Sequence, residues 1–368
     1  MQTKWWLIIG GLVACLALVP AAGAVQVSGL YQAEVGAGDL ALIRPDGDGG
    51  LPAGEAARRE LLMRAGLARV LVRLSGTTQV VADPMVRRRL LDRAESFVAR
   101  YQFLAESTDE PRIRVHFTGQ AVRSALWESG WPVWGRYRPS LLVWVASRSD
   151  GGLELVSADS HPALFSALQG AAARHGLPLL MPLMDGQDRR RLTGRDLLFE
   201  DWERIRAASA RYEPQATLLL RLDSAREGEV RAEWLLHRGD EQAALRSRGS
   251  SVPAAVAGGM RQLLARLAKD YAVYPGKPVT LEAVVHGIDD LTGFARIERG
   301  LTRLAAVASA QPRRVAGGEA RFRLAFRGRP EEAGHILELL DLLRQREAPA
   351  GEAGAASDPP RLHFTYRP

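Results

Sequence analysis

The sequence predicts a chain of small α/β and α+β modules in series, ending in a ferredoxin-like β-α-β-β-α-β domain. Nearly continuous apolar stretches, such as residues 140–146, alternate with amphipathic helical stretches, as in sheets that helices cover on both faces. After a Pro- and Gly-containing linker at residues 274–278, strand and helix patterns follow one another in the split β-α-β order. The length of 368 residues allows two or three domains after a leader.

The first 24 residues predict a signal peptide. Lys4 precedes an apolar run over residues 5–19, Pro20 ends the run, and Ala22-Gly23-Ala24 has the small-x-small form of a signal-peptidase site. The apolar run is shorter than the roughly 20 residues that a membrane-spanning helix needs. We therefore expect cleavage after Ala24 and a periplasmic mature chain without a transmembrane helix.

A lipoprotein is the alternative at this end of the chain. Leu12-Val13-Ala14-Cys15 resembles a lipobox, in which Cys15 would carry the lipid. The apolar residues that follow Cys15 disfavour this, because a lipoprotein continues with a polar tether. Cys15 is also the only cysteine, so cleavage after Ala24 leaves no disulfide, thiol nucleophile or cysteine metal ligand.

The charge of the chain bears on its partners. The formal net charge is +7 and most of the positive charge is Arg. An exported protein rarely meets nucleic acid, so we expect no nucleic-acid partner. A basic chain in the envelope would favour an anionic cell-wall polymer or lipid headgroups, unless the Arg content only reflects genomic composition.

The modules divide the chain at residues 25–130, 131–273 and 278–368. In the N-terminal module we expect two strands and three helices, in the order strand 25–35, helix 55–76, helix 83–100, strand 112–117 and helix 118–129. In the central domain we expect strands at 140–146, 177–184, 216–224, 229–239 and 243–249, and helices at 161–176, 198–211 and 260–271.

The C-terminal module has the most regular pattern. We expect strands at 279–287, 312–317, 319–328 and 362–366, and helices at 289–307 and 331–345. Within residues 319–328, Phe322, Leu324 and Phe326 stand at every second position. This alternation predicts a strand with one buried face.

The sequence gives no catalytic, metal or cofactor motif. The seven histidines are scattered without an HxH pair or HExxH, and neither G-x-S-x-G, S-x-x-K nor a phosphate-binding glycine loop occurs. Asp196, Glu200 and Glu203 suggest a carboxylate cluster, but we interpret them as a solvated helix face on which Glu200 pairs with Arg204. We therefore expect no catalytic residue, no metal and no cofactor.

Residues 127–145 hold half of the eight tryptophans. If residues 131–138 are extended, Trp134, Arg136 and Arg138 share one face and Trp131 lies on the other. These four residues are the candidate site for a ligand or partner. The alternative is structural, because Arg stacked on Trp is a common contact within folded proteins.

Three segments carry a resemblance to a known family. They are GLYQAEV (29–35), VLVRLSG (70–76) and PVWGRYRPSLLVW (132–144), and the closing LHFTY strand also fits. Over residues 26–270 the chain resembles an uncharacterised family of exported proteobacterial proteins, the domain of unknown function twenty-sixty-six. The resemblance implies a periplasmic location and no established activity. The middle block also resembles, in its order of strands and helices, small periplasmic α/β domains that serve as binding and scaffolding modules.

These observations leave three functions open. The first is a non-catalytic periplasmic accessory or scaffolding protein that contacts an envelope protein complex. The second is a peptidoglycan or polysaccharide binder that uses the Trp/Arg surface, and the third, less favoured, is an envelope hydrolase. The hydrolase needs carboxylates that converge from different elements across a cleft, which a sequence pattern does not reveal.

Overall fold

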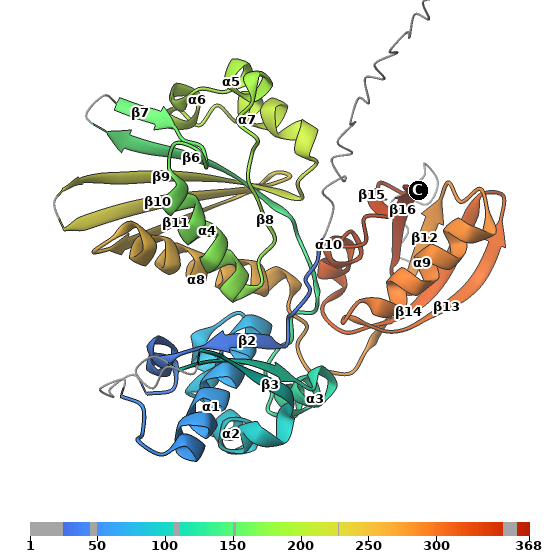
Figure 1. Ribbon diagram of the computed structural model, residues 1–368. Helices are drawn as coiled ribbons and strands as arrows, with labels where there is room; N and C mark the ends of the chain where they lie inside the picture. Colours follow the sequence, from blue (N-terminus) through green and yellow to red (C-terminus); the bar gives the residue numbers. More distant parts are fainter. Residues whose placement is uncertain (1–24, 45–49, 106–110, 150–151, 227, 349–358) are drawn as a thin grey trace, which may run out of the picture.

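The computed structural model describes residues 25–44, 50–105, 111–149, 152–226, 228–348 and 359–368. Figure 1 shows three lobes, each with its own sheet, so the chain mixes α/β and α+β architecture as expected. The expected signal peptide over residues 1–24, with Cys15, lies outside the described residues. Within the described part of the chain, no helix has both the length and the apolar character needed to span a membrane.

The N-terminal lobe is a three-stranded antiparallel sheet, in the order β2-β4-β3, packed on one long helix. Its elements are β2 (Gln32–Val35), α1 (Glu55–Ser75), α2 (Pro84–Arg89), β3 (Val98–Ala105), β4 (Arg112–Phe117) and α3 (Gly119–Glu128), with short 3₁₀ helices at Ala37–Leu42, Thr78–Val81 and Leu91–Phe97. Buried side chains of α1, among them Leu67 and Leu71, pack against Ile113 and Val115 of β4 within one core. Asp83 caps α2 as expected, by accepting hydrogen bonds from the backbone N–H groups of Met85 and Val86.

The helix expected over residues 83–100 is wrong in its second half. The α-helix ends at Arg89, a 3₁₀ helix with a kink at Arg93 follows, and β3 begins at Val98. Residues 98–103 pair with β4, and β-branched and aromatic side chains there suit a pleated sheet better than a helix. Pairing with a distant strand therefore overrides the local helical pattern.

The central lobe is a six-stranded sheet in the order β11-β10-β9-β6-β7, with β8 beside β6. Its strands are β6 (Leu141–Ser149), β7 (Gly152–Leu155), β8 (Leu179–Leu180), β9 (Ala216–Arg226), β10 (Glu229–Arg238) and β11 (Glu241–Gly249). Its helices are α4 (Pro162–His175), α5 (Gly186–Arg191), α6 (Gly194–Leu198), α7 (Trp202–Ser209) and α8 (Val252–Tyr271), and a 3₁₀ turn covers Ala210–Tyr212. The strand expected over 177–184 shrinks to β8, and β7 was not expected.

Helices cover the two faces of the central sheet unequally. On one face, Leu218, Leu220 and Trp234 lie in the same core as Leu168 of α4 and Leu263 of α8. On the other face, α5–α7 cover only the part of the sheet that carries apolar side chains. These sheet residues pack with the helices in a second cluster, and they include Leu142, Trp144, Leu219 and Leu235. The rest of that second face is polar, as described below.

The C-terminal lobe is a five-stranded sheet in the order β13-β14-β12-β16-β15. Its elements are β12 (Val279–His286), α9 (Leu291–Arg303), β13 (Val307–Ala316), β14 (Glu319–Phe326), a 3₁₀ turn (Pro330–Glu332), α10 (Ala333–Leu337), β15 (Leu343–Arg346) and β16 (Arg361–Tyr366). A terminal strand is present as expected, and Phe364 on it is fully buried.

The structure does not confirm the ferredoxin-like ending. The helix expected over 331–345 is short, and residues 343–346 form a fifth strand that pairs with β16. The chain thus reverses once more before β16, which runs parallel to β12. The repeated leucines at 337–343 fit a helix or a strand by their spacing, so the sequence pattern alone does not separate the two.

Candidate functional site

The segment with the four predicted site residues lies where the three lobes meet. The backbone N–H of Trp134 donates to the Leu74 carbonyl at the end of α1, and Val133 forms an isolated bridge with Val273 after α8. A methyl group on Gly135 would lie 2.9 Å from the Ala305 side chain of the C-terminal lobe. Residues 131–138 therefore contact parts of the chain that are far apart in sequence.

Trp134 and Arg138 are buried in this junction. Trp134 is 1% exposed and Arg138 0% exposed, and the Arg138 guanidinium lies 4.1 Å from the centre of the Trp134 ring. The indole also stacks on the ring of Tyr271, with 5.7 Å between the ring centres. Two of the three residues on the predicted Trp134, Arg136 and Arg138 face are therefore buried, as in the structural alternative, because other lobes pack on the segment.

Arg138 is bound by backbone carbonyls in place of a carboxylate. Its guanidinium donates to the carbonyls of Arg73 (2.7 Å) and of His175 (3.0 Å) and Gly176 (3.3 Å), and more weakly to those of Trp134 and Gly135. The first three acceptors lie at the C-terminal ends of α1 and α4, where unsatisfied carbonyls and the helix dipole favour a cation. Arg138 therefore fastens two helix ends of different lobes together.

Arg73 acts in the same way on the other side of this contact. It donates to the carbonyls of Gly29, Leu30 and Gln32, near the start of the described chain, and to the carbonyl of Arg174 in α4. Burial lowers the pKa of Arg73 to about 10 and that of Arg138 to about 9. Both side chains remain protonated at neutral pH, so the junction holds two cations.

The other two predicted residues lie at the edges of the junction. Trp131 is half-buried, and its indole N–H donates to the Asp83 carboxylate at 3.1 Å. Arg136 is exposed. The four predicted residues therefore do not form one common surface: Trp134 and Arg138 connect the lobes, whereas Arg136 faces solvent.

His175 makes the junction sensitive to acid. Burial, and then the charges of Arg174, Arg73 and other arginines, lower the pKa of His175 to about 3 from its ordinary value of 6.5. Below pH 6.5 the unfolded chain binds a proton at this position that the folded chain does not bind, so stability falls as the pH drops from about 6.5 towards 3. We expect H175Q to remove this part of the pH dependence. Chemical denaturation of both proteins across this pH range checks it, and parallel stability curves would refute it.

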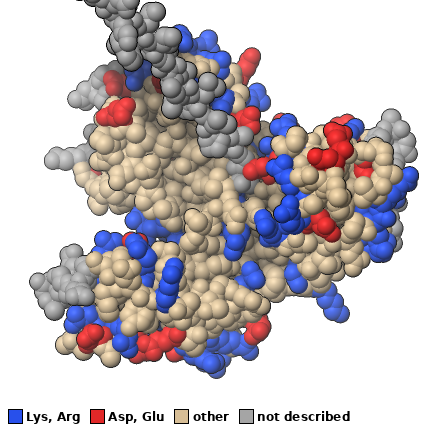
Figure 2. Space-filling model, turned by 45° about the vertical axis from the view of Figure 1, so that its right-hand side comes forward, with Lys and Arg blue, Asp and Glu red and all other residues tan. Residues whose placement is uncertain are grey.

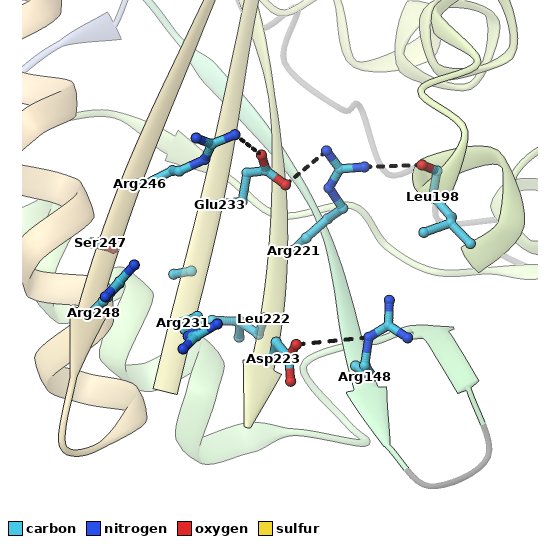
Figure 3. Close-up of a pocket in the computed structure, with 11 residues that line it drawn as sticks. Arg148, Leu198, Arg221, Leu222, Asp223, Arg231, Glu233, Arg246, Ser247 and Arg248 are labelled. Carbon is cyan, nitrogen blue, oxygen red and sulfur yellow. Dashed lines mark hydrogen bonds and ion pairs between the residues drawn. The ribbon is translucent and has the colours of Figure 1, made fainter. Parts of the chain in front are cut away.

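A second candidate site is a hollow of about 460 Å³ on the uncovered part of the central sheet. Figure 3 shows its floor, which carries charged side chains from four neighbouring strands. One cross-strand row contains Arg221, Glu233 and Arg246, and the next row contains Arg148, Asp223, Arg231 and Arg248. The hollow therefore presents both signs of charge, with arginine in excess.

Ion pairs organise these rows. Glu233 lies 2.9 Å from Arg221 and 3.4 Å from Arg246, and Arg148 lies 4.0 Å from Asp223. Arg221 is mostly buried, whereas the side chains of Arg246 and Arg248 are 82% and 73% exposed. The inner pairs therefore fix the floor, and the two outer arginines on β11 reach solvent.

The apolar residue Leu198 lines one side of the hollow, and its carbonyl is hydrogen-bonded to the floor. Arg221 donates to the Leu198 carbonyl at 3.0 Å and pairs with Glu200 at 2.7 Å, and the next residue after Leu198, Phe199, is 68% exposed. Glu200 lies between α6 and α7 with a φ of 55°, so it pairs with the sheet and its expected pairing with Arg204 is wrong. Arg204 lies instead near the Asp196 and Asp201 carboxylates.

The charged rows were missed at the level of sequence, although a signal for them exists. Arg221 and Asp223, Arg231 and Glu233, and Arg246 and Arg248 are spaced by two residues in three successive predicted strands. Side chains at this spacing share one face of a strand. The complete set of lining residues is Arg148, Leu198, Arg221, Leu222, Asp223, Arg231, Ala232, Glu233, Arg246, Ser247 and Arg248.

This arrangement offers recognition by charge and shape. Paired guanidinium and carboxylate groups suit hydrogen bonding to a partner that carries both kinds of charge. Among the residues that the structure describes, no three His, Cys, Asp or Glu side chains are grouped so as to hold a metal ion.

A known family model matches the N-terminal part of the chain. Residues 51–135 match a domain of unknown function (DUF8605), which spans most of the N-terminal lobe and the start of the Trp-rich segment. No curated protein matches the chain. Residues 51–135 therefore resemble a family without an assigned function, and the match does not confirm the particular family expected from the sequence motifs.

Proposed function

We propose that the chain is a non-catalytic accessory protein of the periplasm that docks a protein of an envelope complex on the hollow of the central sheet. The observation that carries this proposal is the combination of a floor of both charges with an exposed aromatic side chain, Phe199, next in sequence to the lining residue Leu198. Exposed arginine and aromatic side chains are enriched at protein interfaces. The periplasmic location rests on the leader sequence over residues 1–24.

The charges of the floor favour a protein over an anionic polymer. A polymer that carries only negative charge would bring its anions towards Asp223 and Glu233 as well as towards the arginines. A protein surface can place basic groups opposite the carboxylates, acidic groups opposite Arg246 and Arg248, and an apolar pocket around Phe199. We therefore infer a partner with a mixed-charge surface.

Polysaccharide binding through the Trp/Arg segment is less well supported. Sugar recognition by Trp uses an exposed ring face, but Trp134 is buried and its ring packs against Arg138 and Tyr271. Of the four predicted residues, Trp131 and Arg136 keep contact with solvent. A polysaccharide contact there would have to rely on these two side chains.

Variants of Phe199 test the proposal by affinity capture from envelope extracts. The full-length chain is the bait, F199D is the test variant, and L291D is the control, because Leu291 is an equally apolar side chain that is 80% exposed on the C-terminal lobe. We expect one partner to be recovered in a fixed ratio by the wild type and by L291D. Loss of an aromatic anchor of about 2 kcal/mol or more should weaken its recovery by F199D roughly 30-fold.

Two results would count against docking at the hollow. Equal recovery of the partner by F199D and the wild type would place the contact elsewhere. Equal loss in F199D and L291D would show that any added surface charge disturbs the contact. Circular dichroism of the three proteins should be the same, because both substituted side chains are exposed.

A further inference from the structure

The sheet of the C-terminal lobe has one covered and one open face. Phe322, Leu324 and Phe326 of β14 point towards the covered face, where Phe294 of α9 stacks on Phe322 at 5.5 Å. Residues that alternate with them, such as Arg321 and Arg323, point to the opposite face. The strand register shows which residues of the other four strands share that open face.

Arginine dominates the open face. The register aligns Arg314 of β13 with Arg321, and it aligns His363 of β16 with both Val284 of β12 and Arg346 of β15. The ionisable residues on this face are Arg314, Arg321, Arg323, Arg344, Arg346, Arg361, Glu282, Glu319, His286 and His363. The face therefore carries six arginines and only two glutamates, distributed over the five strands.

The two glutamates are already occupied by arginines of this face. Glu282 lies 2.6 Å from Arg361, and Glu319 lies 2.7 Å from Arg321. The hydrogen bond from Arg321, with the charges of Arg321, His286 and Arg314, lowers the pKa of Glu319. Among the described residues, the remaining arginines of the face have no ion pair; they are Arg314, Arg323, Arg344 and Arg346.

The middle of the face contains polar groups in place of an apolar patch. Val284 is fully buried, and the rings of His286 and His363 stack beside it at 5.6 Å with a ring-nitrogen contact of 3.3 Å. Arg314 and Arg323 are exposed on β13 and β14, to one side of this centre, and Arg346 is exposed on β15, to the other side. In Figure 2, Lys and Arg side chains outnumber Asp and Glu along the right-hand edge of the C-terminal lobe. Contact with a partner would therefore be made by guanidinium groups.

We propose that this open face binds the phosphate-bearing headgroups of an anionic lipid membrane. Guanidinium groups pair with phosphate in a bidentate manner. Neighbouring strands lie about 4.8 Å apart, so the arginines spread over a width of roughly 20 Å. Such a two-dimensional array of arginines matches a plane of phosphates. A binding site for a linear polymer would instead have its charges along one line or groove. A surface without protruding apolar groups predicts binding that is electrostatic and sensitive to salt.

Vesicle co-sedimentation tests this inference with the full-length chain. The anionic vesicles contain phosphatidylglycerol mixed with phosphatidylcholine. Vesicles of phosphatidylcholine alone serve as the control, because they measure any binding through apolar segments of the chain. The test variant is R314Q/R323Q, and the control is R246Q/R248Q, which removes the same charge from exposed arginines of the central sheet. We expect salt-sensitive binding to the anionic vesicles that falls roughly 30-fold in the test variant and stays near the wild-type value in the control.

Several results would overturn the inference. Equal binding to both kinds of vesicle, or the same loss in both variants, would show that this face is not the contact. Retention of soluble polyphosphate through Arg314 and Arg323, without vesicle binding, would assign the face to a polymer. F199D should bind vesicles as the wild type does, so the failure of this inference and the failure of partner docking at the hollow are distinguishable.

Discussion

Replacing Arg138 by methionine is expected to lower the free energy of unfolding by about 4 kcal/mol. The guanidinium is fully buried, and its donors satisfy carbonyls at the ends of α1 and α4. Methionine fills part of the volume but donates no hydrogen bond, so several buried carbonyls lose their partner at once. Loss of the cation from the Trp134 face adds to the cost.

Arg136 provides a matched control two residues away. Its side chain is exposed, so R136M should change the free energy of unfolding by less than about 0.5 kcal/mol. Urea denaturation of the wild type and both variants measures the difference. Similar stability of R138M and the wild type would show that Arg138 does not hold the lobes together.

Replacing Gly76 by alanine is expected to cost about 3–4 kcal/mol. Gly76 ends α1 with a φ of +81°, which is unfavourable for a residue with a side chain. A methyl group there would also overlap the side chain of Ala268 in α8, at a contact between the N-terminal and central lobes. Backbone strain and steric overlap therefore act together.

Two further variants separate these causes. Gly130 has a φ of +85° and open space around it, so G130A should show only the backbone cost of about 1–2 kcal/mol. In G76A, the second substitution A268G should remove the overlap and recover the larger share of the lost stability. If A268G recovers nothing, close packing of Gly76 on α8 does not account for the loss. Thermal and urea unfolding of the four proteins give the comparison.

The sequence predicts the elements more successfully than it predicts what covers them. The apolar pattern of residues 140–146 predicts β6, and a proline after a cap residue predicts the start of α2. The burial of Trp134 and Arg138 depends on the ends of α1 and α4, which lie tens of residues away in the chain. An alternating pattern states which side chains share a face, but it does not state whether another lobe packs on that face.

Local patterns also fail where two structures fit them equally well. Residues 343–346 follow a leucine-rich stretch that suits a helix, yet they pair with β16. Residues 98–100, the end of the expected helix over 83–100, pair instead with β4. In contrast, the charged rows of the central sheet follow directly from a spacing of two in predicted strands, so Arg221, Glu233 and Arg246 could have been placed on one face.

Site-specific photo-crosslinking tests the proposed site of partner binding most directly. A photoreactive amino acid is placed at position 199, next to the lining residue Leu198, or at position 136, the exposed arginine of the Trp-rich segment. Crosslinking is then carried out in cells that produce the full-length chain. We predict a discrete crosslinked partner from position 199 and none from position 136. A partner captured from position 136 and not from position 199 would contradict docking at the hollow of the central sheet.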